Sequence, residues 1–414
     1  MKVLKFATAG SVDDGKSTLI GRLLYDTRSL TRDQIEAIEK ASLKKGLNEP
    51  DLALATDGLV AEREQGITID VAHIYFSTPR RKFIIADTPG HVEYTRNMIT
   101  GASSSDAVLI LIDARNGMVE QTKRHLYVSN LMRIREVVVC VNKMDLVAFE
   151  EQVFYTISSE IQQYAEGLYH NDFNFHFIPV SAKYGDNIVT VSARMPWYKG
   201  QPLLSLLENL EVEKHNELPA RYVVQHVIRT DNEKFPDYRA LAGKMKSGRL
   251  QVGDKVMVLP SGRMTAIKSI ERYTERLSSV SAGESVSLVL LDDVDASRGS
   301  LIVKIDEVPL PLKNFNATLC WLSTFPGNLS GHYLLQHGVS CTPVKITQIH
   351  SVLNPATLQK EERNVLGLND IAEVSLRTGG YVYADVFEHN PANGSFILID
   401  TQTNHTVAVG FVRG

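Results

Sequence analysis

The sequence of 414 residues predicts an α/β domain with a mainly parallel sheet and helices on both faces, followed by two antiparallel β-barrel domains. Up to about residue 210, short apolar and β-branched runs alternate with helical patterns, which is typical of βαβ units. Beyond that point the apolar period changes to two, and turn signals separate short strands. With domains of roughly 100–200 residues being usual, the length fits this division into three.

The α/β part is expected to place its polar motifs at strand ends. The expected strands are Leu4–Ala9, Ile69–Phe76, Lys82–Ala86, Ala107–Asp113, Glu136–Asn142 and Asn174–Val180. Thr31 followed by Gln34 predicts a capping box at the start of a helix. A last amphipathic helix carries Leu203, Leu206, Leu207 and Leu210, and the polar stretch after it, 211–219, predicts a linker. The first domain is therefore expected to cover residues 1–213.

The remaining chain is rich in turn signals. Gly253-Asp254, Pro260-Ser261-Gly262 and Asn393-Gly394 predict hairpins of a barrel or sandwich. Two prolines in Pro309-Leu310-Pro311 cannot sit in a central strand, so they mark a second boundary. The expected domains cover residues 214–307 and 308–414; a single irregular β domain of about 200 residues is the alternative.

Composition predicts a cytoplasmic protein. The net charge of -4 supplies no attractive field for phosphate backbones or anionic membranes. No stretch approaches the roughly 18 apolar residues of a membrane span, and an apolar strand directly after Met1 and Lys2 leaves no room for a signal peptide. The three cysteines, Cys140, Cys320 and Cys341, lie far apart, and two of them fall in apolar runs typical of buried strands, which fits a reducing compartment.

A glycine-rich motif lies between the first expected strand and a helix. Gly10, four further residues, Gly15, Lys16 and Ser17 match the pattern of a phosphate-binding loop. The loop's amide groups are expected to face phosphate oxygens, Lys16 to bridge the β- and γ-phosphates, and the Ser17 hydroxyl to bind magnesium. The alternative is a glycine-rich turn followed by an exposed lysine. The predicted nucleotide-binding residues are Gly10, Ser11, Val12, Asp13, Asp14, Gly15, Lys16, Ser17 and Thr18.

Two further segments predict contacts to magnesium and the γ-phosphate. Asp87 follows the strand at 82–86, at the carboxyl end where ligands of open α/β sheets collect, and is expected to hold a magnesium-bound water. The amide of Gly90 can approach the γ-phosphate because glycine has no side chain. Thr68 is expected to complete the magnesium coordination while the γ-phosphate is present. Taken alone, Thr68 would be a residue at the start of a strand.

His91 directly follows Gly90 and is the expected catalytic residue. Its imidazole would position the attacking water, acting together with Lys16 and Thr68. Val12 and Ile67 are candidates for apolar walls beside it. A solvent-exposed loop histidine is the alternative.

Base selection is predicted from the end of the fifth expected strand. Asn142-Lys143-Met144-Asp145 places a carboxylate where it can accept hydrogen bonds from guanine N1–H and the 2-amino group, whereas adenine offers no donors on that edge. Lys143 can lay its stem along the base, and Asn142 can tie neighbouring loops together. Ser181-Ala182-Lys183 can turn backbone amides toward the guanine carbonyl oxygen. These motifs together predict binding of GTP and GDP with Mg²⁺.

The motifs resemble those of the translation-factor class of GTPases, in which Asp-Thr-Pro-Gly-His and Asn-Lys-Met-Asp are the habitual forms. Within that class the chain is similar to the GTPase (large) subunit of bacterial ATP sulfurylase, that is, sulfate adenylyltransferase. The likeness spans nearly the whole chain and is looser in the third domain. It is carried by the segments at 13–24, 61–70, Met195-Pro196-Trp197-Tyr198, 258–262 and 294–299.

The resemblance implies a P-loop GTPase that assembles with a smaller catalytic subunit, as a heterodimer or larger. In the family, GTP hydrolysis drives the joining of ATP and sulfate to adenosine 5′-phosphosulfate and pyrophosphate. No second phosphate loop follows, so an adenylylsulfate kinase activity is not expected.

A factor that binds tRNA and the ribosome is the alternative, because it shares the three-domain plan. Residues 308–414 carry six Lys plus Arg against seven Asp plus Glu, which gives no electrostatic footprint for nucleic acid. A purely regulatory GTPase without a role in sulfur chemistry is a third possibility.

Overall fold

The computed structural model divides into two compact units. The first is Met1–Glu213 with Pro355–Leu358, and the second is Lys214–Asn354 with Gln359–Gly414. The structure describes residues 3–44, 46, 49–55, 72–88, 95–102, 105–168, 172–212, 215–232, 235–273 and 275–414.

The first unit contains a six-stranded sheet. Its order is β2 (Ala72–Ser77), β3 (Lys82–Asp87), β1 (Val3–Ala9), β4 (Ala107–Asp113), β5 (Glu136–Asn142) and β6 (Asn174–Pro179). β2 pairs antiparallel with β3, and every other pairing is parallel. The predicted strands are confirmed to within about a residue, except that the expected start of the second strand, residues 69–71, lies outside the described residues.

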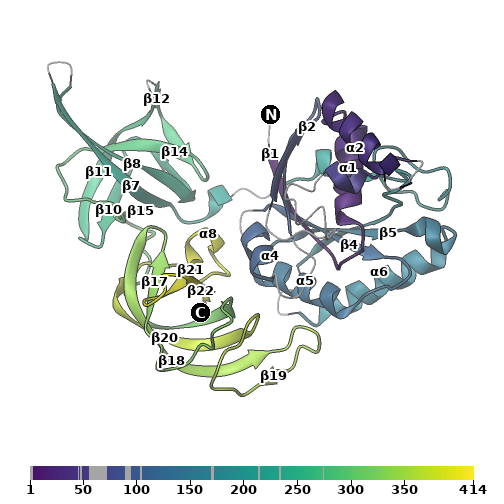
Figure 1. Ribbon diagram of the computed structural model, residues 1–414. Helices are drawn as coiled ribbons and strands as arrows, with labels where there is room; N and C mark the ends of the chain where they lie inside the picture. The colour runs from purple at the N-terminus through teal and green to yellow at the C-terminus, as the bar shows by residue number, and fades with distance from the viewer. Residues whose placement is uncertain are drawn as a thin grey trace. The chain divides into compact units, whose positions relative to one another are not determined.

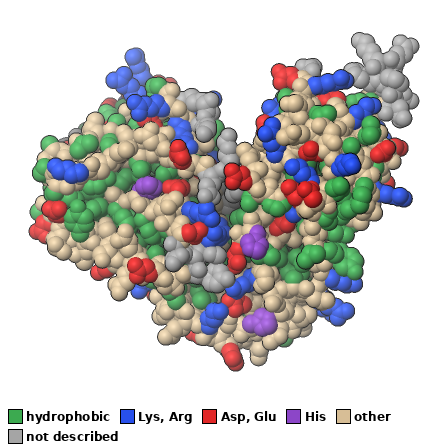
Figure 2. Space-filling model, turned by 180° about the vertical axis from the view of Figure 1, so that it is seen from behind, with side chains coloured by type: hydrophobic (Ala, Val, Ile, Leu, Met, Phe, Trp, Pro, Cys, Tyr) green, Lys and Arg blue, Asp and Glu red, His purple; other side chains and the backbone are tan. Residues whose placement is uncertain are grey.

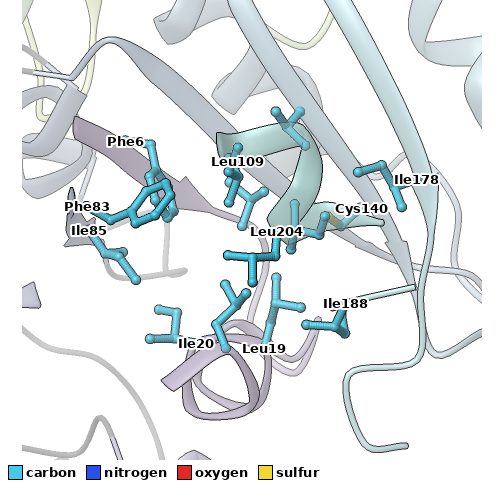
Figure 3. Close-up of a cluster of buried hydrophobic side chains, with 14 of the residues drawn as sticks. Phe6, Leu19, Ile20, Phe83, Ile85, Leu109, Cys140, Ile178, Ile188 and Leu204 are labelled. Carbon is cyan, nitrogen blue, oxygen red and sulfur yellow. The ribbon is translucent and has the colours of Figure 1, made fainter. Parts of the chain in front are cut away.

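Helices cover both faces of this sheet (Figure 1). α1 (Lys16–Asp26) and α7 (Leu203–Asn209) contribute to a core on one face, and Figure 3 shows Leu19, Ile20 and Leu204 converging on Phe6, Leu109 and Cys140. α4 (Thr95–Ala102), α5 (Glu120–Leu131) and α6 (Glu151–Glu166) lie on the other face (Figure 1). The unit also contains α2 (Arg32–Lys44) and the short helices η1 (Leu52–Ala55) and η3 (Met144–Val147).

Two local contacts define helix ends in this unit. At the start of α2, the amide of Gln34 donates to Thr31 Oγ1 (3.3 Å) and the amide of Thr31 donates to Gln34 Oε1 (2.9 Å), so the predicted capping box is confirmed. At the end of α7, the buried guanidinium of Arg81 donates to the carbonyls of Leu207 and Leu210. Arg81 thereby satisfies carbonyls that have no partner within the helix.

The second unit contains two closed antiparallel barrels, as predicted. The first has the order β10-β15-β7-β8-β14-β11 and closes by pairing β10 with β11; the second has the order β17-β21-β22-β16-β20-β18 and closes by pairing β17 with β18. The strands of the first are β7 (Arg221–Asn232), β8 (Phe235–Ser247), β10 (Lys255–Leu259), β11 (Arg263–Arg272), β14 (Ser285–Leu290) and β15 (Leu301–Lys304). Those of the second are β16 (Leu312–Trp321), β17 (Tyr333–His337), β18 (Ser340–Leu353), β20 (Ile371–Val382), β21 (Ser395–Asp400) and β22 (Thr406–Val412).

Smaller elements complete the second unit. β12 (Glu275–Leu277) extends the first barrel, β9 (Arg249–Gln251) pairs with β13 (Ser279–Ser281), and β19 (Lys360–Glu361) extends the second barrel. The linker contains η4 (His215–Glu217). Arg221 of β7 forms a two-pronged ion pair with Asp385 (2.9 and 2.8 Å), which joins the first barrel to the segment after β20.

One of the three predicted hairpin turns is confirmed. Pro260-Ser261-Gly262 joins the paired strands β10 and β11. Gly253-Asp254 joins β9 to β10, which pair with different strands, so it is a turn but not a hairpin.

The prediction at Asn393-Gly394 was wrong, because these residues end the short helix α8 (Pro391–Gly394). Asn393 is buried and donates to Tyr383 O and Asp385 Oδ2, and a Cβ on Gly394 would lie 2.4 Å from the Cα of Phe387. Close packing, rather than turn geometry, requires this glycine.

The chain passes from one barrel to the other between Lys304 and Leu312, the segment that contains both prolines. The division into three domains at residues 213 and 307 remains a prediction. Cys140 and Cys320 are buried in β5 and β16, and Cys341 is exposed in β18. Within the described ranges, no helix has both the length and the hydropathy needed to cross a membrane.

Candidate functional site

The described site residues gather at the carboxyl ends of parallel strands. The glycine-rich loop follows β1, Asp87 ends β3, Asn142 ends β5 and Ser181 follows β6. These strands lie in one sheet in the order β3-β1-β4-β5-β6, so their ends share one edge. The predicted residues Thr68, Gly90 and His91, and the candidate wall residue Ile67, lie outside the described residues.

The glycine-rich loop curls between β1 and α1. Gly15 has φ 93° and Asp13 has φ 67°, so the backbone is left-handed at both positions. A Cβ on Gly15 would lie 2.5 Å from Asn142 Nδ2, which explains why this position needs glycine. Ser17 and Thr18 lie in the first turn of α1, whose N-terminal N–H groups and dipole favour an anion.

Lys16 lies inside the curl. Its side chain is buried, and Nζ donates to Gly10 O (2.8 Å) and Ser11 O (3.1 Å). Burial lowers the pKa of Lys16, while Asp87 and Asp14 oppose that change. The loop's own carbonyls thus hold the ammonium group in place for a phosphate.

The other loop positions divide into exposed and buried groups. Val12 and Asp13 are exposed, whereas Asp14 is buried and its Oδ2 accepts from the Ser11 amide. Burial raises the pKa of Asp14, with the Ser11 amide and Lys16 opposing that change. Asp14 therefore stabilises the loop from within.

Asp87 is held by a residue that the sequence reasoning missed. Thr8 Oγ1 donates to Asp87 Oδ1 (2.7 Å), because β1 and β3 pair in a register that places Thr8 beside Asp87. The Thr88 hydroxyl in turn donates to the Thr8 carbonyl. A threonine in the apolar second half of β1 was the only signal of this role. Asp87 and Thr8 are both buried.

The donor set fits magnesium. Ser17 offers a hydroxyl and Asp87 a carboxylate, and oxygen ligands of this kind suit a hard cation that retains waters and takes further ligands from phosphates. In the described part of the chain, no group of three or more His, Cys, Asp or Glu side chains could hold a metal by itself. The chemistry therefore fits a cation that binds together with a phosphate group.

Asn142 joins the glycine-rich loop to the loop after β6. Its Nδ2 donates to Asp14 O (2.7 Å), and its Oδ1 accepts from the Ala182 amide (2.9 Å). The predicted tie between neighbouring loops is present. The Ala182 amide was expected to face a guanine carbonyl. It donates instead to Oδ1 of Asn142, whose side chain is buried beside it.

Asp145 is oriented by the loop after β6. Ser181 Oγ, itself fully buried, donates to Asp145 Oδ1 at 2.6 Å. This contact holds one carboxylate oxygen of Asp145 and thereby aims the group. Lys183 lies on the same loop, with its ammonium over the Tyr184 ring.

Lys143 is anchored by a second residue that the sequence reasoning missed. Asp113, at the end of β4, accepts from Lys143 Nζ (3.0 Å) and from Arg115. Burial would raise the pKa of Asp113, but its bonds to Arg115 and Lys143 dominate and lower that pKa to about 2. Lys143 has φ 62°, and the ion pair fixes the direction of its stem.

Comparison with known proteins defines the class. The elongation factor Tu GTP-binding domain matches residues 1–214, and the GTP-eEF1A C-terminal domain-like family matches residues 314–413. The fold is also similar to the Saccharomyces cerevisiae Ski7 GTPase-like domain, solved with GTP or with GDP and inorganic phosphate. The TM-score is 0.53 at 17% identity, covering 99% of this chain and 97% of that one. The chain is thus a guanine-nucleotide-binding GTPase of the elongation factor Tu type.

Relatives that match over nearly all of this chain identify its family within that class. Sulfate adenylyltransferase subunit 1 of Aliarcobacter butzleri is 45% identical over 100% of this chain and 87% of its own length. The Mycobacterium tuberculosis bifunctional enzyme CysN/CysC is 45% identical over 99% of this chain and 67% of its own length. The chain belongs to the sulfate adenylyltransferase subunit 1 family.

Proposed function

We propose that the chain is the GTP-hydrolysing subunit of a sulfate adenylyltransferase. In this role it couples GTP hydrolysis to the formation of adenosine 5′-phosphosulfate and pyrophosphate from ATP and sulfate, which a smaller catalytic partner subunit performs. The base site carries the proposal, because the Ser181 hydroxyl aims the Asp145 carboxylate within a GTP-binding unit. Relatives named sulfate adenylyltransferase subunit 1 support the sulfate reaction.

The phosphate-binding roles follow from the loop geometry. Lys16 is proposed to exchange its bonds to Gly10 O and Ser11 O for the β- and γ-phosphate oxygens, which offer full negative charge. Ser17 and Asp87 are proposed to hold Mg²⁺, with Thr8 keeping the Asp87 carboxylate in position. When bound, magnesium would neutralise charge on the β- and γ-phosphates.

The roles of Thr68, Gly90 and His91 rest on their motifs. Thr68 is proposed as a magnesium ligand in the GTP state, Gly90 as an amide donor to the γ-phosphate, and His91 as the residue that positions the attacking water. Loss of the γ-phosphate would release these contacts. That release can bias a partner interface between two states, which is the physical requirement for energetic coupling.

Guanine selection is proposed to use Asp145, Lys143 and the loop 181–183. Asp145 is half-buried before a nucleotide binds, and a bound base would cover its carboxylate. An ATP molecule would leave that carboxylate without the donors that guanine supplies, and an unmet buried acceptor costs about 1–3 kcal/mol or more. Asp145→Asn is expected to shift preference from GTP to xanthosine triphosphate. Titration of the purified chain with both nucleotides tests this assignment, and unchanged GTP affinity in the variant would remove Asp145 from the base site.

The experiment that tests the coupled reaction is reconstitution with the smaller subunit. Sulfate-dependent pyrophosphate release is expected to be faster with GTP than with a non-hydrolysable analogue. Equal rates would refute the coupling while leaving GTP binding intact. A His91→Ala variant is expected to bind GTP but to release pyrophosphate at the rate seen with the analogue.

Surface charge does not favour an RNA-carrying function. On the face drawn in Figure 2, Lys and Arg side chains are interspersed with Asp and Glu, so neither sign forms a continuous field there. Residues 308–414 are nearly balanced in charge, with six basic and seven acidic side chains. Phosphate backbones are bound through an excess of Lys and Arg, and this segment has no such excess.

A further inference from the structure

The outer edge of β6 leaves backbone groups available for pairing. Among the described strands, β6 is at the end of the sheet order and its one partner is β5. The amides of Asn174 and Val180 donate to Arg135 O and Val141 O, each at 2.8 Å. Because alternate residues of a strand face its neighbour, the even-numbered residues face β5, and Phe175 and Phe177 direct their N–H and C=O groups outward.

The Met195-Pro196-Trp197-Tyr198 motif covers part of this edge. The Tyr198 hydroxyl is within hydrogen-bonding distance of the outward carbonyl of Phe177 (3.4 Å) and of Gln201 O (3.1 Å). No hydrogen bond involves the outward backbone groups of Phe175 in the described ranges. The outward carbonyl of Phe177 is therefore covered, whereas both outward backbone groups of Phe175 are open.

A cavity of about 600 Å³ lies beside the open part of the edge. Its walls come from the start of β5 and β6 and from the end of α7, through residues that include Glu136, His176, Leu206, Asn209 and Glu211. These residues lie at the amino ends of the strands, whereas Asn142 and the nucleotide-site residues lie at the carboxyl ends. The cavity is thus separate from the nucleotide site.

The lining of the cavity is acidic. Among the described residues that line it are Glu136 and Glu211 and no Lys or Arg. Glu136 is only 18% exposed, and its carboxylate contacts Asn174 Nδ2 (2.7 Å) and His176 Nε2 (3.0 Å). Within the described part of the chain, no Lys or Arg forms an ion pair with it. A carboxylate in such a site gains from a basic group that enters from outside.

The lining also has an apolar side. Phe173 and Phe175 both border the cavity, with ring centroids 5.2 Å apart, and Phe177 continues the row 5.4 Å from Phe175. An occupant with both basic and apolar side chains would therefore find a complement for each.

We propose that this cavity and the β6 edge dock an extended segment of a partner polypeptide. The segment would pair with the outward N–H and C=O of Phe175 as an added strand, direct a Lys or Arg side chain to Glu136, and lay apolar side chains on the phenylalanine row. Backbone pairing supplies affinity in this mode of recognition, and the side-chain pockets supply specificity.

Model peptides test the proposal on the full chain with GDP bound. The probe is fluorescently labelled acetyl-Val-Lys-Val-Lys-Val-amide, the charge control replaces both lysines by glutamate, and unlabelled N-acetyl-lysine amide supplies the cation without a strand. Fluorescence anisotropy is expected to show binding of the basic peptide only, with N-acetyl-lysine amide competing at least tenfold more weakly than the unlabelled peptide.

Variants separate the two contacts. Glu136→Gln is expected to weaken binding of the basic peptide at least tenfold. Glu160 is an exposed glutamate of α6, and Glu160→Gln is expected to leave the affinity for the peptide unchanged. Phe175→Ala removes the ring but keeps the outward N–H. Phe175→Pro removes the ring and the N–H, and because that N–H faces away from β5, the hydrogen bonds between β5 and β6 stay intact. The proline variant is therefore expected to bind the peptide more weakly than the alanine variant. Unchanged GDP affinity verifies that each variant is folded.

Four results would overturn the proposal. They are equal binding of the basic and acidic peptides, no binding of either, equal effects of Glu136→Gln and Glu160→Gln, and competition by N-acetyl-lysine amide as strong as that by the peptide. The last result would assign the cavity to small amines. None of these results bears on guanine-nucleotide coupling, so failure here is distinguishable from failure of the proposed function.

Discussion

Arg81→Met is expected to loosen the end of α7. The Arg81 Nη1 donates to the carbonyls of Leu207 (3.1 Å), Glu208 (3.4 Å) and Leu210 (2.5 Å), and the side chain is 6% exposed. Methionine fills most of the same space but donates nothing. The change therefore removes the charged donor and keeps the apolar stem.

The magnitude follows from the donors lost. Nη1 carries two N–H groups, and a hydrogen bond from a charged donor contributes about 1.5–3 kcal/mol. Because carbonyls at a helix end regain some bonds to water, we expect about 3 kcal/mol, which is roughly a hundredfold in a local opening constant.

Hydrogen exchange measured by mass spectrometry is the suitable assay, since the two units need not unfold together in denaturant. Peptides that cover α7 are expected to lose about a hundredfold in protection, while peptides that cover β4 stay unchanged. The matched control is Arg80→Met. The Arg80 side chain is 70% exposed and pairs with Glu208 at 3.5 Å, so it is expected to contribute under about 1 kcal/mol. Equal protection of α7 in the two variants would refute the capping role of Arg81.

Three further changes test other contacts. Ser181→Ala removes the donor that aims Asp145 and is expected to lower GTP affinity about tenfold or more in a nucleotide titration. Asp113→Asn should lower the free energy of unfolding by about 2 kcal/mol at neutral pH, because the folded-state pKa of Asp113, about 2, lies below the ordinary 3.8. Urea unfolding should show the difference between the two proteins shrinking as the pH falls from about 4 to 2. Asp385→Ala leaves Arg221 buried without its anion and should destabilise the second unit by about 3–5 kcal/mol in thermal unfolding.

Each of the three has a result that contradicts it. GTP affinity that survives Ser181→Ala would mean that Asp145 is aimed by other contacts. A difference for Asp113→Asn that is independent of pH would assign its effect to packing. For Asp385→Ala the control is Asp293→Ala, whose carboxylate is 85% exposed and pairs with Arg239; equal losses in the two variants would show that burial of the Arg221 pair is unimportant.

Local sequence determined the classes of residue at the nucleotide site. Gly15 has a φ of 93°, a left-handed backbone conformation that favours glycine, and Lys16, Ser17 and Asp145 carry the groups that their proposed roles need. These requirements act on single residues or short segments, so they remain visible in the chain. The strand boundaries were predictable for the same reason, since buried parallel strands are continuous apolar runs.

Long-range pairings were decided by the tertiary structure. Thr8 reaches Asp87 through the register of β1 and β3, Asp113 reaches Lys143 across adjacent strand ends, and Arg221 reaches Asp385 across 164 positions. Each pairing depends on which strands become neighbours and on how deeply the groups are buried, and neither is encoded in a short segment.

Gly394 is a single residue whose role also depends on the tertiary structure. Asn-Gly is a turn signal when the two positions are exposed. In the folded chain Asn393 is buried against Asp385, and Gly394 packs against the Phe387 backbone, so close approach replaces turn geometry as the reason for the glycine. The sequence by itself determined which chemistry the nucleotide site can perform, and the packing of distant segments decided which side chains hold that site in place.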